Sequence, residues 1–362
     1  MKVDFFNLNK VNAKIKKDIL KKISKLIDCS SFVDGKTVKL FEEKFAEYCG
    51  TKYCIAVSNG SAALQLAIIA STRNFKNKNI ATPPNSFFAT SASIKHAGLN
   101  PYFIDVNKEN LNINTDILEK EKKNFSGIVP VSLYGNPCNL TKIEEIAKTH
   151  NKFFVHDACQ AHGAMHNGKK ISQYAGLTCF SFYPSKNLGA IGEGGAIVTD
   201  SHDLYKKICQ LKNQGQEQRY HHSMLGFNFR MDEIQAAALL IKLKYIDEWN
   251  DERISIANRY VKNLKDNKKI NLLQVRQEDK CVYHLFPIFT EHKNILIQKF
   301  EKAQIGFGFH YPIPIYDQEP FKTSGNKFLY TEMSKRDQIS LPIFIGMKSK
   351  QIDYVCDIIN SL

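Results

Sequence analysis

The sequence has few arginines, no long apolar run and no paired-cysteine motif. Only seven of its 50 basic residues are arginine, and the other 43 are lysine. No window approaches the roughly 18 consecutive apolar residues that a membrane span needs, so we expect no membrane partner. The first residues lack a charged-then-apolar leader, so we expect a cytoplasmic protein. Nine cysteines occur without a CxxC spacing, which favours reduced thiols over a disulfide framework and predicts no metal site.

The net charge of +14 allows two interpretations. A basic chain can bind nucleic acid, which would make this a binding protein rather than an enzyme. Nucleic-acid interfaces usually gather their basic residues in one patch and use arginine to contact base edges. Here the lysines are spread along the whole chain. We therefore favour a lysine-rich solvated surface and expect no nucleic-acid partner.

Length and patterning predict an α/β fold. A chain of 362 residues with 43% hydrophobic residues can bury a full core and has the size of two domains. From about residue 50, short apolar runs alternate with helix-length segments, which is typical of a largely parallel, buried sheet flanked by helices. The expected strands are residues 53–57, 79–82, 101–105, 127–131, 153–156 and 178–182, with helices at 61–70, 86–97 and 140–150.

The pattern changes after Arg230. Residues 231 to about 264 form one long helical pattern without an internal glycine or proline. A strand-like run at 282–289 and helical patterns near 292–303 and 348–359 then indicate a smaller α+β unit. We place the large domain at residues 1–245 and the small domain at 246–362, with the N-terminal segment as a candidate to pack with the latter.

The segment SNGSAAL, residues 58–64, follows a predicted strand and opens a helix. Gly60 allows close backbone approach, and Ser61 places a hydroxyl and an N–H at a helix N-terminus, an arrangement that suits a phosphate. Serine and asparagine are also common helix N-caps. An ordinary cap therefore remains the simpler interpretation of this segment taken alone.

Asp157 ends the apolar strand FFVHD, and Gln160 follows three residues later. In open α/β sheets, ligands bind at the carboxyl ends of the strands, so Asp157 stands where a site is expected. A buried carboxylate there needs a cationic partner or it takes up a proton. Taken alone, Asp157 is as good a candidate for a helix cap as for a ligand contact.

Lys186 lies in SFYPSKNLG, among aromatic and small residues rather than in a run of charges. A lysine in such surroundings can be desolvated and its pKa lowered, as Schiff-base chemistry requires. Most lysines are nevertheless exposed. Residues 189–195 have the glycine spacing of a dinucleotide loop but do not lead from a strand into a helix, so we discount a Rossmann motif.

The combination of these segments points to one cofactor. Pyridoxal 5′-phosphate needs a phosphate cradle, an acid beside its ring nitrogen and a lysine that binds its aldehyde. The three segments around Ser61, Asp157 and Lys186 supply such groups in chain order.

Over nearly its full length the sequence resembles the DegT/DnrJ/EryC1/StrS family of sugar aminotransferases. The resemblance is carried by many ordered segments, among them SNGSAAL, HDACQAHG, SFYPSKNLGAIGEGG and GFNFRMDEIQAA. It implies the aspartate aminotransferase-like fold, known as fold type I: a mostly parallel mixed sheet flanked by helices, with a smaller C-terminal α+β domain. The matching segments are residues 41–42, 45–46, 58–64, 85–90, 156–163, 181–195, 226–237 and 310–314.

The resemblance also implies roles for individual residues. Lys186 matches the lysine that binds the cofactor and moves the proton, and Asp157 matches the acid on the pyridine nitrogen. Gln160 matches the contact to the ring 3-oxygen. Phe87 matches the aromatic residue stacked on the ring, with a core phenylalanine as the alternative. The residues that match the phosphate cradle are Gly60, Ser61 and Ser181.

In this family an asparagine reaches the phosphate across a dimer interface, and the matching residue is Asn228. The resemblance therefore implies a homodimer with composite sites. His156 and Cys159 depart from the glutamate and alanine frequent in the family, which affects only fine geometry. Lysine at position 186 argues against the dehydratase branch, where this position is histidine.

The branch resembled aminates C3 of nucleotide-linked sugars, which implies a dTDP-3-keto-6-deoxyhexose as acceptor and L-glutamate as donor. Amination at C4 and amination of a small phosphorylated ketone remain alternatives, and glycan synthesis is the implied setting. Each candidate substrate contact has the alternative of an ordinary surface-loop residue; these candidates are Tyr183, Arg219, Tyr220, His221, His310 and Tyr311.

Overall fold

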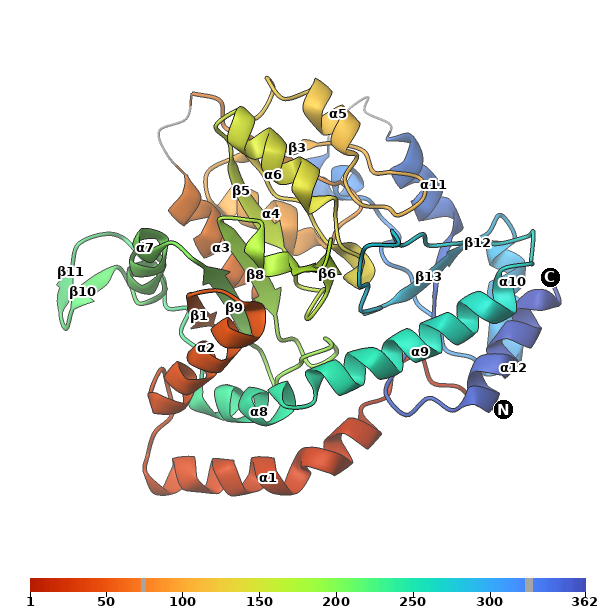
Figure 1. Ribbon diagram of the computed structural model, residues 1–362, viewed down its shortest axis with the longest axis horizontal. Helices are drawn as coiled ribbons and strands as arrows, with labels where there is room; N and C mark the ends of the chain where they lie inside the picture. Colours follow the sequence, from red (N-terminus) through yellow and green to blue (C-terminus); the bar gives the residue numbers. More distant parts are fainter. Residues whose placement is uncertain (73–75, 323–327) are drawn as a thin grey trace.

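A seven-stranded sheet forms the centre of the protein in the computed structural model, which describes residues 1–72, 76–322 and 328–362 (Figure 1). The strand order is β1-β9-β8-β5-β4-β2-β3. Every neighbouring pair from β8 through β5, β4 and β2 to β3 is parallel. Strand β9 runs antiparallel to both of its neighbours, β1 and β8. The strands are β1 (Tyr53–Val57), β2 (Asn79–Thr82), β3 (Asn100–Phe103), β4 (Gly127–Ile128), β5 (Phe153–Asp157), β8 (Leu177–Ser181) and β9 (Gly195–Thr199).

Helices cover both faces of this sheet, because successive side chains of each strand point to opposite faces and both sets are apolar. In β1, Ile55 and Val57 belong to one hydrophobic cluster, and Cys54 and Ala56 to another. The first face is covered by α3 (Gly60–Ser71), α4 (Phe88–His96) and α7 (His202–Lys212). The second is covered by α2 (Lys36–Cys49), α5 (Thr115–Lys120), α6 (Leu140–Thr149) and α8 (Glu233–Leu243). The mostly parallel mixed sheet expected from the sequence is confirmed.

The expected long helix over 231–264 is wrong, because the chain forms two helices. α8 ends at Leu243, and α9 runs from Ile246 to Leu264. Neither glycine nor proline causes the break. Tyr245 has φ −115° and ψ −1°, outside the α-helical values, and its ring stacks on Trp249 one turn into α9.

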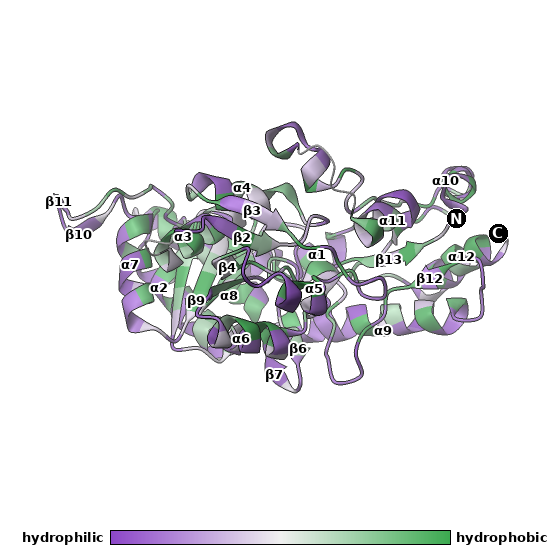
Figure 2. Ribbon diagram, turned by 90° about the horizontal axis from the view of Figure 1, so that it is seen from above, coloured by the Kyte–Doolittle hydropathy of each residue, from purple (hydrophilic) through white to green (hydrophobic). Residues whose placement is uncertain are grey.

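The second hydrophobic core lies around α9 and a small antiparallel sheet, as expected for an α+β unit. The strand predicted at 282–289 is shorter, with only Phe286–Phe289 forming β13. The division at residue 245 stays a prediction. The remaining elements of this part are β12 (Asn271–Leu272), α10 (Lys293–Lys302), α11 (Leu329–Asp337), β14 (Gln338–Leu341) and α12 (Ser349–Asn360). Figure 2 shows α9 with both hydrophobic and hydrophilic faces.

Two segments extend from this framework. The N-terminal helix α1 (Asn9–Asp28) packs its apolar stripe against α8 and the start of α9, and Val3 pairs with Ile305 in the second core. The hairpin of β10 (Gln216–Gln218) and β11 (His221–His222) projects from the body at the left of Figures 1 and 2. A short hairpin, β6 (Met165–His166) and β7 (Lys169–Lys170), precedes β8. Among the described residues, no helix is long and apolar enough to cross a membrane.

Candidate active site

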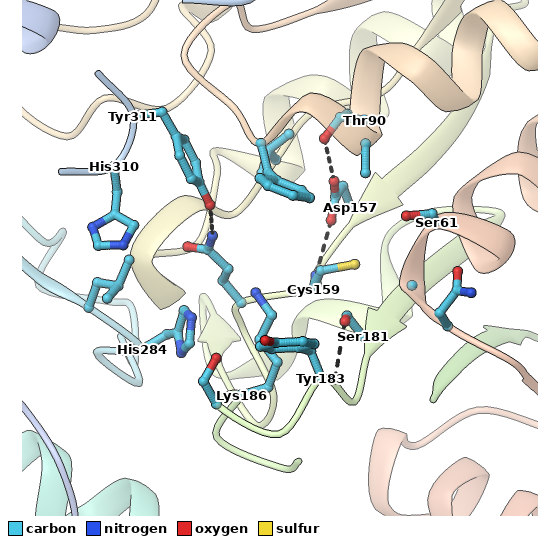
Figure 3. A pocket seen from close by; sticks show the side chains of 18 of the residues that line it. Ser61, Thr90, Asp157, Cys159, Ser181, Tyr183, Lys186, His284, His310 and Tyr311 are labelled. Carbon is cyan, nitrogen blue, oxygen red and sulfur yellow. Dashed lines mark hydrogen bonds between the residues drawn. The ribbon is translucent and has the colours of Figure 1, made fainter. Parts of the chain in front are cut away.

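A cavity of about 860 Å³ opens at the carboxyl ends of the central strands (Figure 3). Strands β1, β5 and β8 run in the same direction, so the residues that follow them meet at one edge of the sheet. The segments around Gly60, Asp157 and Lys186, more than 100 residues apart at the extremes, therefore line one cavity. Residues 284–285 and 310–311, from the C-terminal part of the chain, also line it.

Lys186 stands on a tight turn directly after β8. Its backbone N–H donates to the carbonyl of Tyr183 at 2.8 Å, and Ala190 N–H returns to the carbonyl of Phe182 at 2.7 Å. Burial lowers the pKa of the Lys186 ammonium from its ordinary value, an effect that nearby Cys159 and Asp157 oppose. Within the described residues, Nζ makes no hydrogen bond or ion pair. A lysine that is easily neutralised and has a free amine is suited to nucleophilic chemistry.

Asp157 is 4% exposed at the end of β5. Thr90 Oγ1 donates to its Oδ2 at 2.8 Å, and the backbone N–H of Cys159 donates to its Oδ1 at 3.1 Å. These two bonds fix the plane of the carboxylate. No ion pair reaches it from any described residue, so the cation that a buried carboxylate calls for is left to a ligand.

The β1–α3 turn forms the end of the cavity beside Ser181. Asn59 caps α3 by accepting the N–H of Ala62 at 2.8 Å, so the capping alternative is correct for Asn59. Gly60 and Ser61 line the cavity at this N-terminus, where the N–H groups of a first helical turn have no helical partner. A Cβ at Gly60 would lie 2.5 Å from Cβ of Ser181. Only glycine lets these two segments approach, and the resulting nest suits an anion.

Gln160, Phe87 and Tyr311 form the wall between these groups. Gln160 Oε1 accepts the N–H of Tyr134 at 2.7 Å, and its Nε2 donates to the hydroxyl of Tyr311 at 3.0 Å. Phe87 is 56% exposed and its ring lies 5.6 Å from that of Tyr311. The alternative of a core phenylalanine is therefore wrong for Phe87, whose face is free to cover a planar ligand.

The opposite wall contains His284 and Phe5, which the sequence motifs did not single out, and Cys159, which was noted only as a departure from the family. His284 and Cys159 lie on the cavity beside Lys186, and Phe5 reaches it from the N-terminal segment. Thr90 was inside a matching motif, but its bond to Asp157 depends on tertiary packing. His310, which was predicted, stacks at 5.9 Å on Phe5, and burial lowers the pKa of its imidazole to about 4.

Four predicted residues lie outside this cavity. Arg219, Tyr220 and His221 are exposed on or beside the projecting hairpin, with the Arg219 guanidinium 5.1 Å from the centre of the Tyr220 ring. Asn228 is exposed on the loop that leads to α8. Tyr183, in contrast, lines the cavity and is 51% exposed. The roles predicted for the four outlying residues thus require a second chain.

These residues fit pyridoxal phosphate. The unpaired buried carboxylate of Asp157 suits a protonated ring nitrogen, and Phe87 suits the face of the ring. The anion nest of Gly60, Ser61 and Ser181 suits the phosphate. Lys186 lines the same cavity, and its amine has no bonding partner among the described residues.

Comparisons with known proteins agree with this geometry. The model of the DegT/DnrJ/EryC1/StrS aminotransferase family matches residues 13–360. The dTDP-3-amino-3,6-dideoxy-alpha-D-galactopyranose transaminase of Aneurinibacillus thermoaerophilus is 34% identical over 99% of both chains. GDP-perosamine synthase of Escherichia coli O157:H7 is 31% identical over 90% of both.

Solved structures share the whole fold. The crystal structure of DesV from S. venezuelae has a TM-score of 0.95 at 30% identity, covering 99% of this chain and 98% of that one. The structure of ntda from Bacillus subtilis, with bound cofactor PMP, has a TM-score of 0.92 at 29% identity, covering 99% of this chain and 84% of that one. The arrangement is therefore fold type I, as expected from the sequence.

Proposed function

Because the chain belongs to the DegT/DnrJ/EryC1/StrS aminotransferase family and is a pyridoxal-phosphate-dependent aminotransferase, we propose that it aminates C3 of a dTDP-linked 3-keto-6-deoxyhexose with L-glutamate as donor. The observation that carries this proposal is the full-length match to a dTDP-3-amino sugar transaminase. It is supported by the cavity, which is also lined by His284 and His310, side chains suited to hydrogen-bonding a polar sugar substrate.

In this proposal Asp157 and Lys186 have different roles in the reaction. The cofactor supplies an electron-accepting ring when bound. Asp157 holds the proton on the ring nitrogen through its negative charge, because an opposite charge favours the protonated form. Lys186 would hold the cofactor through Nζ and, once freed by the amino donor, would move a proton at the reacting carbon. Its lowered pKa keeps more of the amine neutral, as both binding and proton abstraction require.

The position of amination can be tested directly with the holoenzyme. We expect glutamate to react with the 3-keto dTDP-6-deoxyhexose and not with its 4-keto isomer, because only one carbon of a fixed sugar can reach Lys186. The new amine is located by NMR of the product. Amination of the 4-keto sugar alone would refute the C3 assignment, and turnover with neither sugar would refute the substrate class.

We also propose a homodimer in which Asn228 of one protomer completes the phosphate site of the other. Asn228 is exposed and outside the cavity of its own chain. The neighbouring segment carries exposed apolar side chains, with Leu225 96% and Tyr220 81% exposed. Large apolar side chains exposed on one projecting segment are consistent with an interaction surface. In a dimer, Arg219, Tyr220 and His221 would meet the substrate of the other protomer, with the guanidinium on a phosphate.

Mixed dimers test this sharing. Lys186→Ala and Asn228→Ala are each expected to be inactive or nearly so as homodimers. A hybrid of the two regains one intact site, because the Asn228→Ala protomer has Lys186 and receives Asn228 from its partner. We expect hybrids to show about half of the wild-type activity per dimer. No recovery in verified hybrids would show that Asn228 acts within its own chain, whereas an active Asn228→Ala homodimer would show that Asn228 has no role.

A further inference from the structure

His284 lies on the cavity wall between Val282 and the start of β13, and neither the motifs nor the proposed mechanism uses it (Figure 3). Its side chain is buried, with the residue 8% exposed. Three neighbouring carbonyls, those of Tyr283, His284 itself and Ile343, accept bonds at 3.2–3.4 Å from the buried guanidinium of Arg253 on α9. The backbone that carries the imidazole is therefore held rigidly against the cavity.

A chain of two asparagines determines which nitrogen of His284 carries the proton. Asn250 Nδ2 donates to the carbonyl of His162 at 2.8 Å, so Asn250 Oδ1 points to Asn187. Asn187 Nδ2 donates to that oxygen at 2.8 Å and to the carbonyl of Val282 at 2.9 Å. Because backbone carbonyls only accept, both amide orientations are set. Asn187 Oδ1 must then accept from Nδ1 of His284, 3.2 Å away.

His284 therefore has its proton on Nδ1 and a bare lone pair on Nε2. Within the described residues, no donor bonds to Nε2. Burial lowers the pKa of this imidazole well below its ordinary value, and the charges of Lys186 and Arg253 and the nearby His162 and His310 add to the effect. The ring stays neutral at physiological pH. Nε2 is thus a permanent hydrogen-bond acceptor on a residue that lines the cavity.

We infer that Nε2 of His284 accepts a hydrogen bond from a sugar hydroxyl on a carbon next to the ketone, an inference that rests on the proposed function. An acceptor-only nitrogen disfavours a carbonyl or phosphate oxygen and selects a donor. The reacting carbon must come to Lys186, and Asn187, the next residue, holds His284. The groups that reach Nε2 are therefore those on the neighbouring carbons. His284 thereby determines specificity for a hydroxylated acceptor.

The reverse half-reaction tests this inference with stable compounds. The holoenzyme is mixed with the 3-amino-3,6-dideoxy dTDP-sugar, its 2-deoxy analogue or its 4-deoxy analogue, and the change in cofactor absorbance is followed. Wild-type protein is expected to react about 10- to 100-fold more slowly with one of the two analogues than with the parent sugar, because the missing hydroxyl leaves the buried Nε2 of His284 without a hydrogen-bond donor. The His284→Asn variant is expected to react with the parent sugar more slowly than wild type by a similar factor. It is expected to react with the parent sugar and both analogues at similar rates.

Two comparisons separate specificity from general damage. Asparagine places a donor near the position of Nδ1, so it can keep the bond to Asn187 while removing Nε2, whereas His284→Gln restores an acceptor near Nε2 and is expected to recover part of the discrimination. The half-reaction with glutamate, which has no hydroxyl, reports general damage. The ratio of the sugar rate to the glutamate rate is expected to fall about 10- to 100-fold in His284→Asn.

The outcomes are distinct. If wild-type protein reacts with the parent sugar but does not discriminate against either analogue, the inference is overturned. The same follows if His284→Asn keeps the wild-type preference, or if its sugar and glutamate rates fall equally. If glutamate reacts and none of the 3-amino sugars does, the proposed function itself fails and the inference with it.

Discussion

Replacing Lys186 by alanine will abolish transamination and the visible absorbance that comes from lysine-bound cofactor. Lys186 provides the only cavity amine among the described residues, and its lowered pKa matches the two tasks of binding and proton transfer. Loss of the proton-transfer group alone removes typically 10²- to 10⁴-fold of rate, and loss of covalent binding adds to it. We therefore expect turnover to fall by at least about 10⁴-fold in a coupled assay for 2-oxoglutarate release.

Two further variants test whether the loss of activity is due to the amine of Lys186 itself. Lys169→Ala removes an exposed lysine on the β6–β7 hairpin and is expected to behave as wild type. Lys186→Arg keeps a cation of similar length but has no free amine at cellular pH, so it should be as inactive as the alanine variant. Added methylamine should restore a small part of the activity of Lys186→Ala. Substantial turnover by Lys186→Arg would contradict the assignment.

The α/β fold class and the ligand-binding end of the sheet were predictable because they depend on local sequence patterns, whereas fold type I was implied by the family resemblance. The strands around Ile55 and Val155 are short apolar runs bounded by turn residues, and their length and flanking residues together indicate buried strands. Asp157 ends its strand, and Lys186 lies on the turn that follows β8. Parallel strands then bring these residues to one edge whatever the loops between them contain.

Other features depend on contacts between distant segments, which no local pattern encodes. Strand β9 was not expected, because a glycine-rich run precedes it and one of its pairing partners, β1, is remote in sequence. The break at Tyr245 has neither glycine nor proline. The role inferred for His284 comes from amides more than 30 residues away along the chain and from the carbonyls that orient them.

Replacing Asp157 by asparagine is expected to reduce kcat by about 10²- to 10³-fold, the range found when one group that stabilises developing charge is removed. The substitution preserves shape, and Thr90 can turn its hydroxyl to accept from the new amide, so the protein should remain folded. What disappears is the negative charge that keeps the ring nitrogen protonated. Single-turnover rates with glutamate measure the loss without the sugar, and circular dichroism in the visible range checks that cofactor is still bound.

Thr90→Val is the matched control for this charge. It removes the 2.8 Å bond to Oδ2 of Asp157 but leaves the carboxylate and its bond from the Cys159 N–H in place. A neutral hydrogen bond contributes about 0.5–1.5 kcal/mol, so we expect a loss of only about 2- to 13-fold. The two variants thus separate the charge from its orientation. If Asp157→Asn lost no more than Thr90→Val, the negative charge of Asp157 would not be what activates the ring, and the carboxylate would serve only to hold α4 and β5 together.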